Sequence, residues 1–320
     1  MKKTLSLACT ALLACGSAMA ADWDMPTPYS DKTFHTANII EFAKDISENS
    51  GGKLNITVHS AGSLIKHAEI KNAVRSQQVP IGEFFLSRLS NEDAAFGIDS
   101  QPFVATSYDD AEKLWAAQKP VITELLAQQR LMPLFAVPWP PQGLYTKAEI
   151  QSVDDLRGLK FRAYNAALEQ FAIQAGAAPT QVEASDIAQA FSTGQVEAMI
   201  TSPSTGANTS AWDFVSHYAP INAWVPKNIV VVNKVAFDAL DAETQQVVLA
   251  AAEAAEKRGW EMSQAETAEK TAVLDENGMT ITTPSDTLLD GLKAIGQDMQ
   301  QAWQAEASDA AKAIADAYQN

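Results

Sequence analysis

The sequence predicts an α/β fold with two lobes. Segments with the period of strands alternate with segments with the period of helices along the chain. About 300 residues follow an N-terminal targeting segment, enough for one two-lobed protein or two modest domains. A helical segment of about thirty residues near the C-terminus is long enough to bridge two lobes.

The first twenty residues have the pattern of a secretory signal peptide. Two lysines precede a short apolar stretch at residues 5–14, and an Ala-Met-Ala sequence fits cleavage after Ala20. The apolar stretch is far shorter than the ~20 residues that a membrane span needs. A lipoprotein processing site at Cys15 is the alternative. The pattern therefore predicts a periplasmic protein.

Composition excludes several classes of function. Cys9 and Cys15 lie in the targeting segment, so a mature chain without cysteine has no disulfide, thiolate nucleophile or Cys-ligated metal. Cleavage also changes the formal net charge from −16 to −18, because residues 1–20 contain two lysines and no acidic residue. A chain this acidic does not bind nucleic acid through its general field. No apolar seam or patch indicates an oligomer, so we expect a monomer.

The N-terminal half alternates between strands and helices. A first strand ends near Tyr29, and His35 opens the helix after it. A Gly-Gly turn precedes the next strand. The elements expected from there are a strand at 54–59, a helix at 66–76, a strand at 79–85, a helix at 108–128 interrupted at Pro120, and a strand at 131–137 before the proline-rich turn 138–141.

The C-terminal half begins with a capping box at Ser152 and Asp155. The elements expected after it are a strand at 159–164, a helix at 165–175 ended by Gly176, a helix at 185–193, strands at 196–201 and 229–233, a helix from the N-cap Asp241 to about 274, a strand at 279–283 and a final helical pair from 285. The strand at 229–233 is almost wholly β-branched, which predicts burial on both faces. The long helix keeps no heptads, which favours a bridging helix over a coiled coil.

Arg162 is the leading candidate for a ligand-binding residue. It lies near the carboxyl end of a predicted strand, just before the N-terminus of a helix. Ligands of open α/β sheets bind outside the carboxyl ends of strands, and a helix N-terminus favours anions. A guanidinium there can take a carboxylate bidentately. The alternative is a surface arginine in an exposed strand, the commoner fate of an arginine.

Four segments in order resemble the signatures of one protein family. They are Val-Asp-Asp-Leu-Arg-Gly-Leu-Lys-Phe-Arg at 153–162, Ala-Gly-Ala-Ala-Pro at 175–179, Ala-Gln-Ala-Phe-Ser-Thr-Gly-Gln-Val-Glu-Ala at 188–198, and Val-Val-Asn-Lys at 231–234. The chain resembles a DctP-like solute-binding subunit of a TRAP (tripartite ATP-independent periplasmic) transporter. The resemblance implies a two-lobed periplasmic binding protein fold with hinge strands and a long lobe-spanning helix. It also implies that Arg162 binds the carboxylate of the solute.

The resemblance implies a division of the chain into lobes. Residues 21–143 and about 230–268 form lobe I, and residues 144–229 and about 269–320 form lobe II. Two segments depart from the family pattern. The loop at 138–147 lacks the arginine that many members have there, so no second arginine contact is expected from it, and Thr201-Ser-Pro-Ser-Thr replaces an Asn-Pro.

Further candidates follow strand ends or lie on turns. Hydroxyl groups after the strand at 196–201 can bind a ligand or cap the next helix, and large aromatic side chains on turns line clefts or simply pack. Asn165 has N-capping as its alternative role, and Glu83 has that of a solvated edge residue. The full set of predicted ligand-binding residues is Arg162, Tyr164, Asn165, Ser202, Ser204, Thr205, Trp224, Glu83, Phe84, Trp139 and Tyr29.

The predicted function is that of a receptor which binds a small organic acid between its lobes and delivers it to a TRAP permease. Aromatic candidates without a clear second cation favour a monocarboxylate with an apolar or aromatic body. A ligand-sensing subunit for a membrane signalling protein is one alternative, and a periplasmic enzyme is another. The four histidines show no metal spacing, and no H-E-x-x-H, G-x-S-x-G, P-loop or G-x-G-x-x-G motif is present. We therefore expect no catalysis, metal or cofactor.

Overall fold

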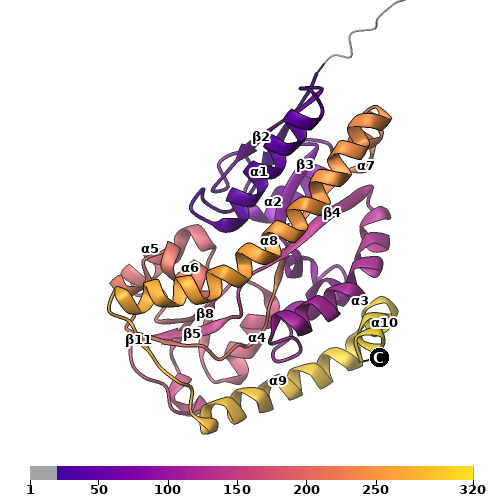
Figure 1. Cartoon of the computed structure of the whole chain (residues 1–320). Coiled ribbons are helices and arrows are strands. Elements are labelled where there is room, and N and C mark those ends of the chain that lie inside the picture. Colours follow the sequence, from indigo (N-terminus) through magenta and orange to yellow (C-terminus); the bar gives the residue numbers. More distant parts are fainter. Residues whose placement is uncertain (1–19, 320) are drawn as a thin grey trace, which may run out of the picture.

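The computed structural model describes residues 20–319, which form two lobes (Figure 1). The predicted signal peptide lies, apart from Ala20, outside the described residues. One lobe contains a two-stranded and a three-stranded sheet, and the other contains a six-stranded sheet. The predicted α/β fold with two lobes is confirmed.

The first lobe is centred on strand β10 (Lys227–Asn233), which pairs antiparallel with β3 and β4. Its residues are all buried, as predicted from its β-branched sequence. Strands β1 and β2 form a parallel pair beside this sheet. The other elements of the lobe are β1 (Ala21–Pro26), α1 (Phe34–Asn49), β2 (Leu54–His59), α2 (His67–Arg75), β3 (Ile81–Phe85), η1 (Leu86–Leu89), η2 (Ala94–Ser100), α3 (Tyr108–Ala127), β4 (Leu131–Pro138) and α7 (Lys234–Asp238).

The second lobe surrounds a sheet with the strand order β11-β9-β5-β8-β6-β7. Strand β6 is parallel to both of its neighbours, β7 and β8, so the carboxyl ends of these strands meet at one edge. The elements of this lobe are β5 (Gly143–Thr146), η3 (Val153–Leu156), β6 (Lys160–Ala163), α4 (Ala166–Gln174), β7 (Ala178–Gln181), η4 (Ala184–Asp186), α5 (Ile187–Ser192), β8 (Ala198–Thr201), α6 (Pro203–Asn208), η5 (Ala211–Asp213), β9 (His217–Ala219), β11 (Thr280–Ile281) and α9 (Asp286–Glu306).

Two antiparallel segments cross between the lobes side by side. One joins β4 to β5, and the other joins β9 to β10. The backbone N–H of Trp139 donates to the carbonyl of Pro226 at 2.8 Å. The Gln142 N–H donates to Trp224 at 3.0 Å, and the Gln142 carbonyl accepts from Ala223 at 2.9 Å. These paired crossing segments are the hinge strands that the resemblance implies.

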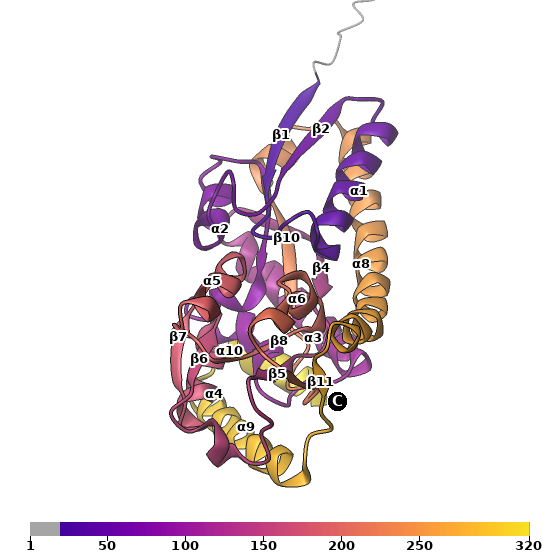
Figure 2. The ribbon, with the colours of Figure 1, turned by 90° about the vertical axis from the view of Figure 1, so that its left-hand side faces the viewer.

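Helix α8 (Ala242–Glu276) is 35 residues long and spans both lobes (Figures 1 and 2). It begins where predicted, because the Asp241 carboxylate accepts the N–H of Thr244. The helix packs on α1 and β4 in the first lobe and on α6 and β11 in the second. The predicted lobe-spanning helix is confirmed.

The C-terminal helices also connect the lobes. Helix α9 packs on α4, and α10 (Asp309–Gln319) returns to α3 in the first lobe (Figure 1). Ala311 and Ile314 of α10 are buried in the same apolar cluster as Leu114 of α3. The predicted lobe boundaries stay a prediction. The end of the segment 269–320, however, lies against the first lobe, because the apolar face of α10 packs on α3.

Two details of secondary structure differ from the expectations. Helix α3 continues through Pro120, so the predicted interruption there is wrong. Leu114 and Ile122, both fully buried, anchor the helix on either side, and this packing outweighs the loss of one backbone hydrogen bond. Strands β5, β7 and β9 were not expected, because their three or four residues are too few to establish an alternating pattern.

Gly259 permits the close approach of α8 to β4. A Cβ atom at this position would overlap the side chain of Val137 and lie 2.7 Å from Asn38 Nδ2. Replacing glycine by alanine inside a helix normally stabilises by ~1 kcal/mol, but overpacking costs ~1–3 kcal/mol. We expect Gly259→Ala to lower the free energy of unfolding by up to ~2 kcal/mol in urea titrations.

The matched control is Glu253→Ala on the exposed face of the same helix, which should change stability by less than ~0.5 kcal/mol. A gain in stability from Gly259→Ala would show that α8 moves away from β4 at little cost.

Candidate functional site

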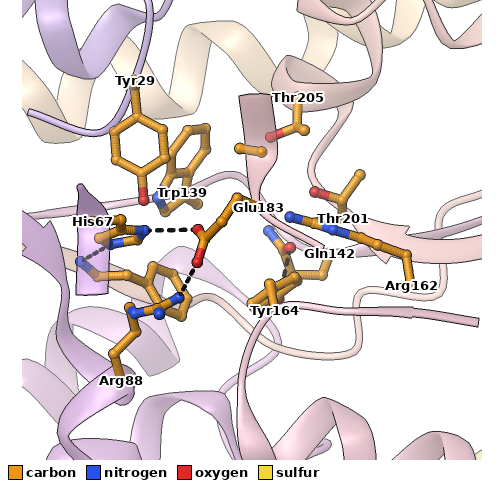
Figure 3. A pocket seen from close by; sticks show the side chains of 12 residues that line it. Tyr29, His67, Arg88, Trp139, Gln142, Arg162, Tyr164, Glu183, Thr201 and Thr205 are labelled. Atoms are coloured by element: carbon orange, nitrogen blue, oxygen red, sulfur yellow. Dashed lines mark hydrogen bonds and ion pairs between the residues drawn. The ribbon is translucent and has the colours of Figure 1, made fainter. Parts of the chain in front are cut away.

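A cavity lies between the lobes beside the crossing segments (Figure 3). It holds about 430 Å³ of space free of protein atoms, part of it open to solvent. Both lobes and the crossing segments contribute to its lining. The lining residues are Tyr29, His67, Phe85, Arg88, Trp139, Gln142, Arg162, Tyr164, Glu183, Ala184, Thr201 and Thr205.

Three neighbouring strands of the second lobe deliver polar side chains to the cavity. Arg162 lies near the end of β6, Thr201 ends β8, and Glu183 follows the end of β7. The strands are parallel, so these side chains emerge at the same edge of the sheet. This is the edge at which α/β sheets bind ligands.

Arg162 is a buried cation with an exposed fraction of 3%. Its Nε–H donates to the carbonyl of Val182 at 3.0 Å, and its guanidinium carbon lies 4.8 Å from the centre of the Tyr164 ring. Burial lowers the pKa of Arg162 to about 10, so the group stays protonated at neutral pH. Among residues 20–319, Arg162 forms no ion pair. A positive charge without a direct counter-charge therefore faces the cavity.

Tyr29 and Trp139 form one aromatic side of the cavity, and Asn228 holds both. The Tyr29 hydroxyl and the Trp139 Nε1–H donate to Asn228 Oδ1 at 3.1 and 3.0 Å. The amide group of Asn228 donates in turn to Glu83 at 2.9 Å. The two rings meet edge to face at 5.0 Å between centres. The shared acceptor fixes the orientation of both rings.

Tyr164 forms a second aromatic side. Its hydroxyl donates to Gln142 Oε1 at 3.0 Å and accepts from Trp224 Nε1–H at 2.9 Å. Phe85 packs edge to face on its ring at 5.4 Å. Gln142 and Trp224 both belong to the crossing segments, so the hinge positions Tyr164.

Glu183 connects the two lobes across the cavity (Figure 3). Its carboxylate accepts from Arg88 Nη1 at 2.9 Å and lies 3.1 Å from His67 Nδ1. The backbone N–H of Phe85 donates to His67 Nε2 at 3.1 Å. His67 Nε2 must therefore be unprotonated, so the neutral ring carries its proton on Nδ1 and donates it to Glu183.

The charges around Glu183 keep it ionised. Burial by itself would raise the pKa of the Glu183 carboxyl. The hydrogen bond with His67 and the positive charges of Arg88 and Arg162 outweigh burial and lower the pKa to about 2. Burial has the opposite effect on His67 and lowers its pKa. This agrees with the neutral ring that the hydrogen bond from Phe85 requires.

The sequence matches the family of bacterial extracellular solute-binding proteins, family 7 (DctP), over residues 27–309. The chain belongs to this family. The predicted resemblance is confirmed, and the protein is an extracytoplasmic solute receptor of the kind that serves TRAP transporters.

Three solved receptors are similar to this one over nearly their whole length. DctP7 of Bordetella pertussis, a receptor that binds pyroglutamic acid, is 40% identical, with 94% of this chain and 100% of that chain covered and a TM-score of 0.93. DctP6 of the same organism, which also binds pyroglutamic acid, is 42% identical, with 93% and 99% covered and a TM-score of 0.92. A TRAP solute-binding protein from an unidentified marine microbe, specific for pyroglutamate, is 41% identical, with 94% and 99% covered and a TM-score of 0.91.

Five of the predicted ligand-binding residues line the cavity of the receptor. They are Arg162, Tyr164, Trp139, Tyr29 and Thr205. Their roles in binding stay a prediction, but the fold brings them together from both lobes and the hinge.

Six other candidates are not among the lining residues, because each is engaged elsewhere. Trp224 is fully buried and supports Tyr164 from behind, and Phe84 lies in the apolar core. Glu83 is buried and accepts from Thr27 and Asn228, which excludes the alternative of a solvated edge.

Three of these six belong to helix N-termini. Asn165 caps α4 and donates to Ser87 of the first lobe at 2.9 Å. Ser202 caps α6, and Ser204 donates to Glu266 of α8 at 2.5 Å. The alternative reading of Asn165 as an N-cap is thus observed, together with a contact between the lobes.

Sequence reasoning missed His67, Arg88, Gln142 and Glu183. We expected no clear second cation in the cavity, but Arg88 lines it together with Arg162. Arg88 lies in η1 directly after β3, so a search of the predicted strand ends would have included it, and Glu183 follows β7. Strand β7 was not expected, which hid Glu183.

Residues 20–319 contain no helix that is both long and apolar enough to cross a membrane. In the same part of the chain, no group of three or more His, Cys, Asp or Glu side chains is arranged to hold a metal ion. The family to which the chain belongs is one of solute-binding receptors rather than of enzymes.

The ionised state of Glu183 predicts a pH-dependent contribution to stability. Its pKa is about 2 in the folded protein against an ordinary value of 4.5, so this contribution is complete above pH 4.5 and is lost as the pH falls toward 2. Solvent screens the charge of this partly exposed group, which reduces its contribution to stability. We therefore expect Glu183→Gln to lower the melting temperature by only roughly 1–3 °C at pH 7. The difference should shrink progressively when thermal unfolding is followed from pH 5 to pH 3.

Asp186→Asn in the same turn removes one negative charge outside the cavity and corrects for the change in net charge. An equal difference between Glu183→Gln and the unmodified protein at every pH would contradict the stabilised carboxylate.

Proposed function

We propose that the receptor binds pyroglutamate between its lobes and delivers it to a TRAP membrane permease. Pyroglutamate is a five-membered lactam ring with one carboxylate, so it is a monocarboxylate as predicted from the sequence. Its ring is a small cyclic amide rather than the apolar or aromatic body that we expected. Pyroglutamate receptors 40–42% identical over at least 93% of this chain support this ligand.

The observation that carries the proposal is the buried guanidinium of Arg162 at the edge of the cavity. A carboxylate on Arg162 gains charge-assisted hydrogen bonds at a site already removed from water. The guanidinium is prearranged, since the Val182 carbonyl and the Tyr164 ring hold it in place. Little side-chain freedom is then lost on binding.

The aromatic side chains accommodate the ring. Tyr29, Trp139 and Tyr164 are held by hydrogen bonds at their polar ends, so their faces and edges are fixed around the cavity. A flat five-membered ring fits between rigid aromatic surfaces with little reorganisation. Thr201 and Thr205 add hydroxyl groups on the side of the second lobe.

Binding between the lobes couples the ligand to lobe closure. Asn165 and Glu183 of the second lobe already contact Ser87, His67 and Arg88 of the first. Rotation about the crossing segments would break these contacts and open the cavity. A permease can then distinguish the loaded receptor by its closed shape.

The periplasmic location rests on the sequence. The signal pattern ends at Ala20, and the first strand, β1, starts at Ala21.

Titration calorimetry of the mature chain with pyroglutamate tests the proposal. The marine relative was obtained with co-purified pyroglutamate, so the protein should first be unfolded, dialysed and refolded. We expect saturable binding and, at a hundredfold excess over Kd, a gain of ~2.7 kcal/mol, or a rise in melting temperature of roughly 5 °C.

Glucuronate, succinate and benzoate serve as comparison ligands of other classes. Binding of one of these in preference to pyroglutamate would overturn the proposed ligand while leaving the receptor family intact.

Arg162→Ala tests the carboxylate contact. Removing one partner of a buried charge pair costs ~2–5 kcal/mol, so we expect pyroglutamate to bind at least ~30-fold more weakly. Arg162→Lys keeps the charge but loses the bidentate geometry and should give an intermediate loss.

Arg157→Ala is the matched control, because Arg157 lies in the same motif and its exposed side chain pairs only with Asp154 among the described residues. A loss of tenfold or less for Arg162→Ala would show that another group anchors the carboxylate.

A further inference from the structure

Glu183 places a negatively charged carboxylate in a cavity that binds organic acids, which are themselves negatively charged. Its side chain projects between Arg88 and His67 on one side and Arg162 on the other (Figure 3). A carboxylate at this position repels any anionic ligand that offers it no hydrogen-bond donor. Arg88 and His67 offset part of this repulsion, and a hydrogen-bond donor on the ligand would offset more of it.

The carboxylate is held in one orientation as an acceptor. Arg88 and His67 each donate one hydrogen bond to it, at 2.9 and 3.1 Å. The single proton of the neutral His67 ring is used in this contact, because Phe85 donates to the other ring nitrogen. An ionised carboxylate offers about four lone-pair sites, so about two remain for other donors.

The backbone places this acceptor next to the carboxylate site. The Nε–H of Arg162 donates to the carbonyl of Val182, the residue directly before Glu183. Both side chains line the cavity, and the positive charge of Arg162 is close enough to Glu183 to lower the pKa of its carboxyl. Their proximity fits a ligand whose own carboxylate and N–H group are on adjacent atoms, as they are in pyroglutamate.

We propose that Glu183 determines specificity by accepting the ring N–H of a cyclic amide acid whose carboxylate is bound by Arg162. Acids that lack a donor next to the carboxylate cover the Glu183 acceptor without pairing it and are rejected. This inference rests on the proposed function, since it names Glu183 as the residue that recognises the ring N–H of the proposed ligand.

A pair of ligands that differ in one group tests the inference. They are pyroglutamate and 5-oxotetrahydrofuran-2-carboxylate, in which a ring oxygen replaces the N–H. The unmodified receptor should bind the lactam roughly 10- to 150-fold more tightly than the lactone, the range expected for a hydrogen bond to a charged group. In Glu183→Gln this ratio should fall to about threefold or less, because the side-chain amide can turn either an oxygen or an NH₂ group to the ring.

The ratio separates recognition from lobe closure. Both ligands have the same size and require the same closed lobes, so weaker hydrogen bonding of residue 183 to His67 and Arg88 changes both affinities equally. Asp186→Asn, in the same turn but outside the lining of the cavity, should keep the ratio of the unmodified protein. Glu183→Asp keeps the charge but withdraws the carboxylate by one methylene group, and should give an intermediate ratio.

An unchanged lactam-to-lactone ratio in Glu183→Gln, with pyroglutamate still bound by the unmodified protein, would overturn the inference and leave the proposed function standing. Equal binding of the two ligands by the unmodified protein would overturn it in the same way. Failure of the unmodified protein to bind pyroglutamate would instead overturn the proposed function, and the role of Glu183 with it.

Discussion

The buried positive charge of Arg162 is the constraint on which the binding site depends. Moving a guanidinium out of water costs several kcal/mol unless protein groups replace the lost hydration. The Val182 carbonyl and the Tyr164 ring supply part of that replacement. Tyr164 in turn is held by Gln142 and Trp224, one on each crossing segment. The position of Arg162 is thus determined by the hinge as much as by its own strand.

The crossing region contains a second buried charge. Lys227, at the start of β10, is fully buried with its Nζ 3.7 Å from Asp99, and Asp99 also accepts the Lys227 backbone N–H at 3.0 Å. Burial lowers the pKa of Lys227 and raises that of Asp99, while their mutual attraction opposes both shifts. Removing either partner would leave the other charge buried and unpaired. The pair therefore fixes η2 to the strand that leaves the hinge, close to the cavity.

Long elements and strand-end chemistry could be predicted from the sequence, whereas contacts between the lobes could not. The apolar period of α8 and the β-branched run of β10 are strong local signals. The place of Arg162 between a strand and a helix cap predicted the sheet edge that borders the cavity. Glu183 and Arg88 form their hydrogen bond only because the fold brings two segments that are distant in the sequence together. Such a contact cannot be predicted from a local sequence pattern. Trp224 was predicted to bind the ligand but does not line the cavity. It is fully buried and supports Tyr164 through a hydrogen bond instead.

Charge inside the cavity, rather than the charge of the whole chain, accounts for the binding of an acid. A formal net charge of −16, or −18 after the predicted cleavage, repels anions at long range, but salt screens such fields beyond ~8–10 Å. Of the charged residues that line the cavity, Arg88 is matched by Glu183, His67 is neutral, and Arg162 has no ion-pair partner among the described residues. The lining thus carries an excess of one positive charge. One carboxylate neutralises it, whereas a second would face no unmatched cation, so the same arrangement that attracts a monoanion disfavours a dicarboxylate.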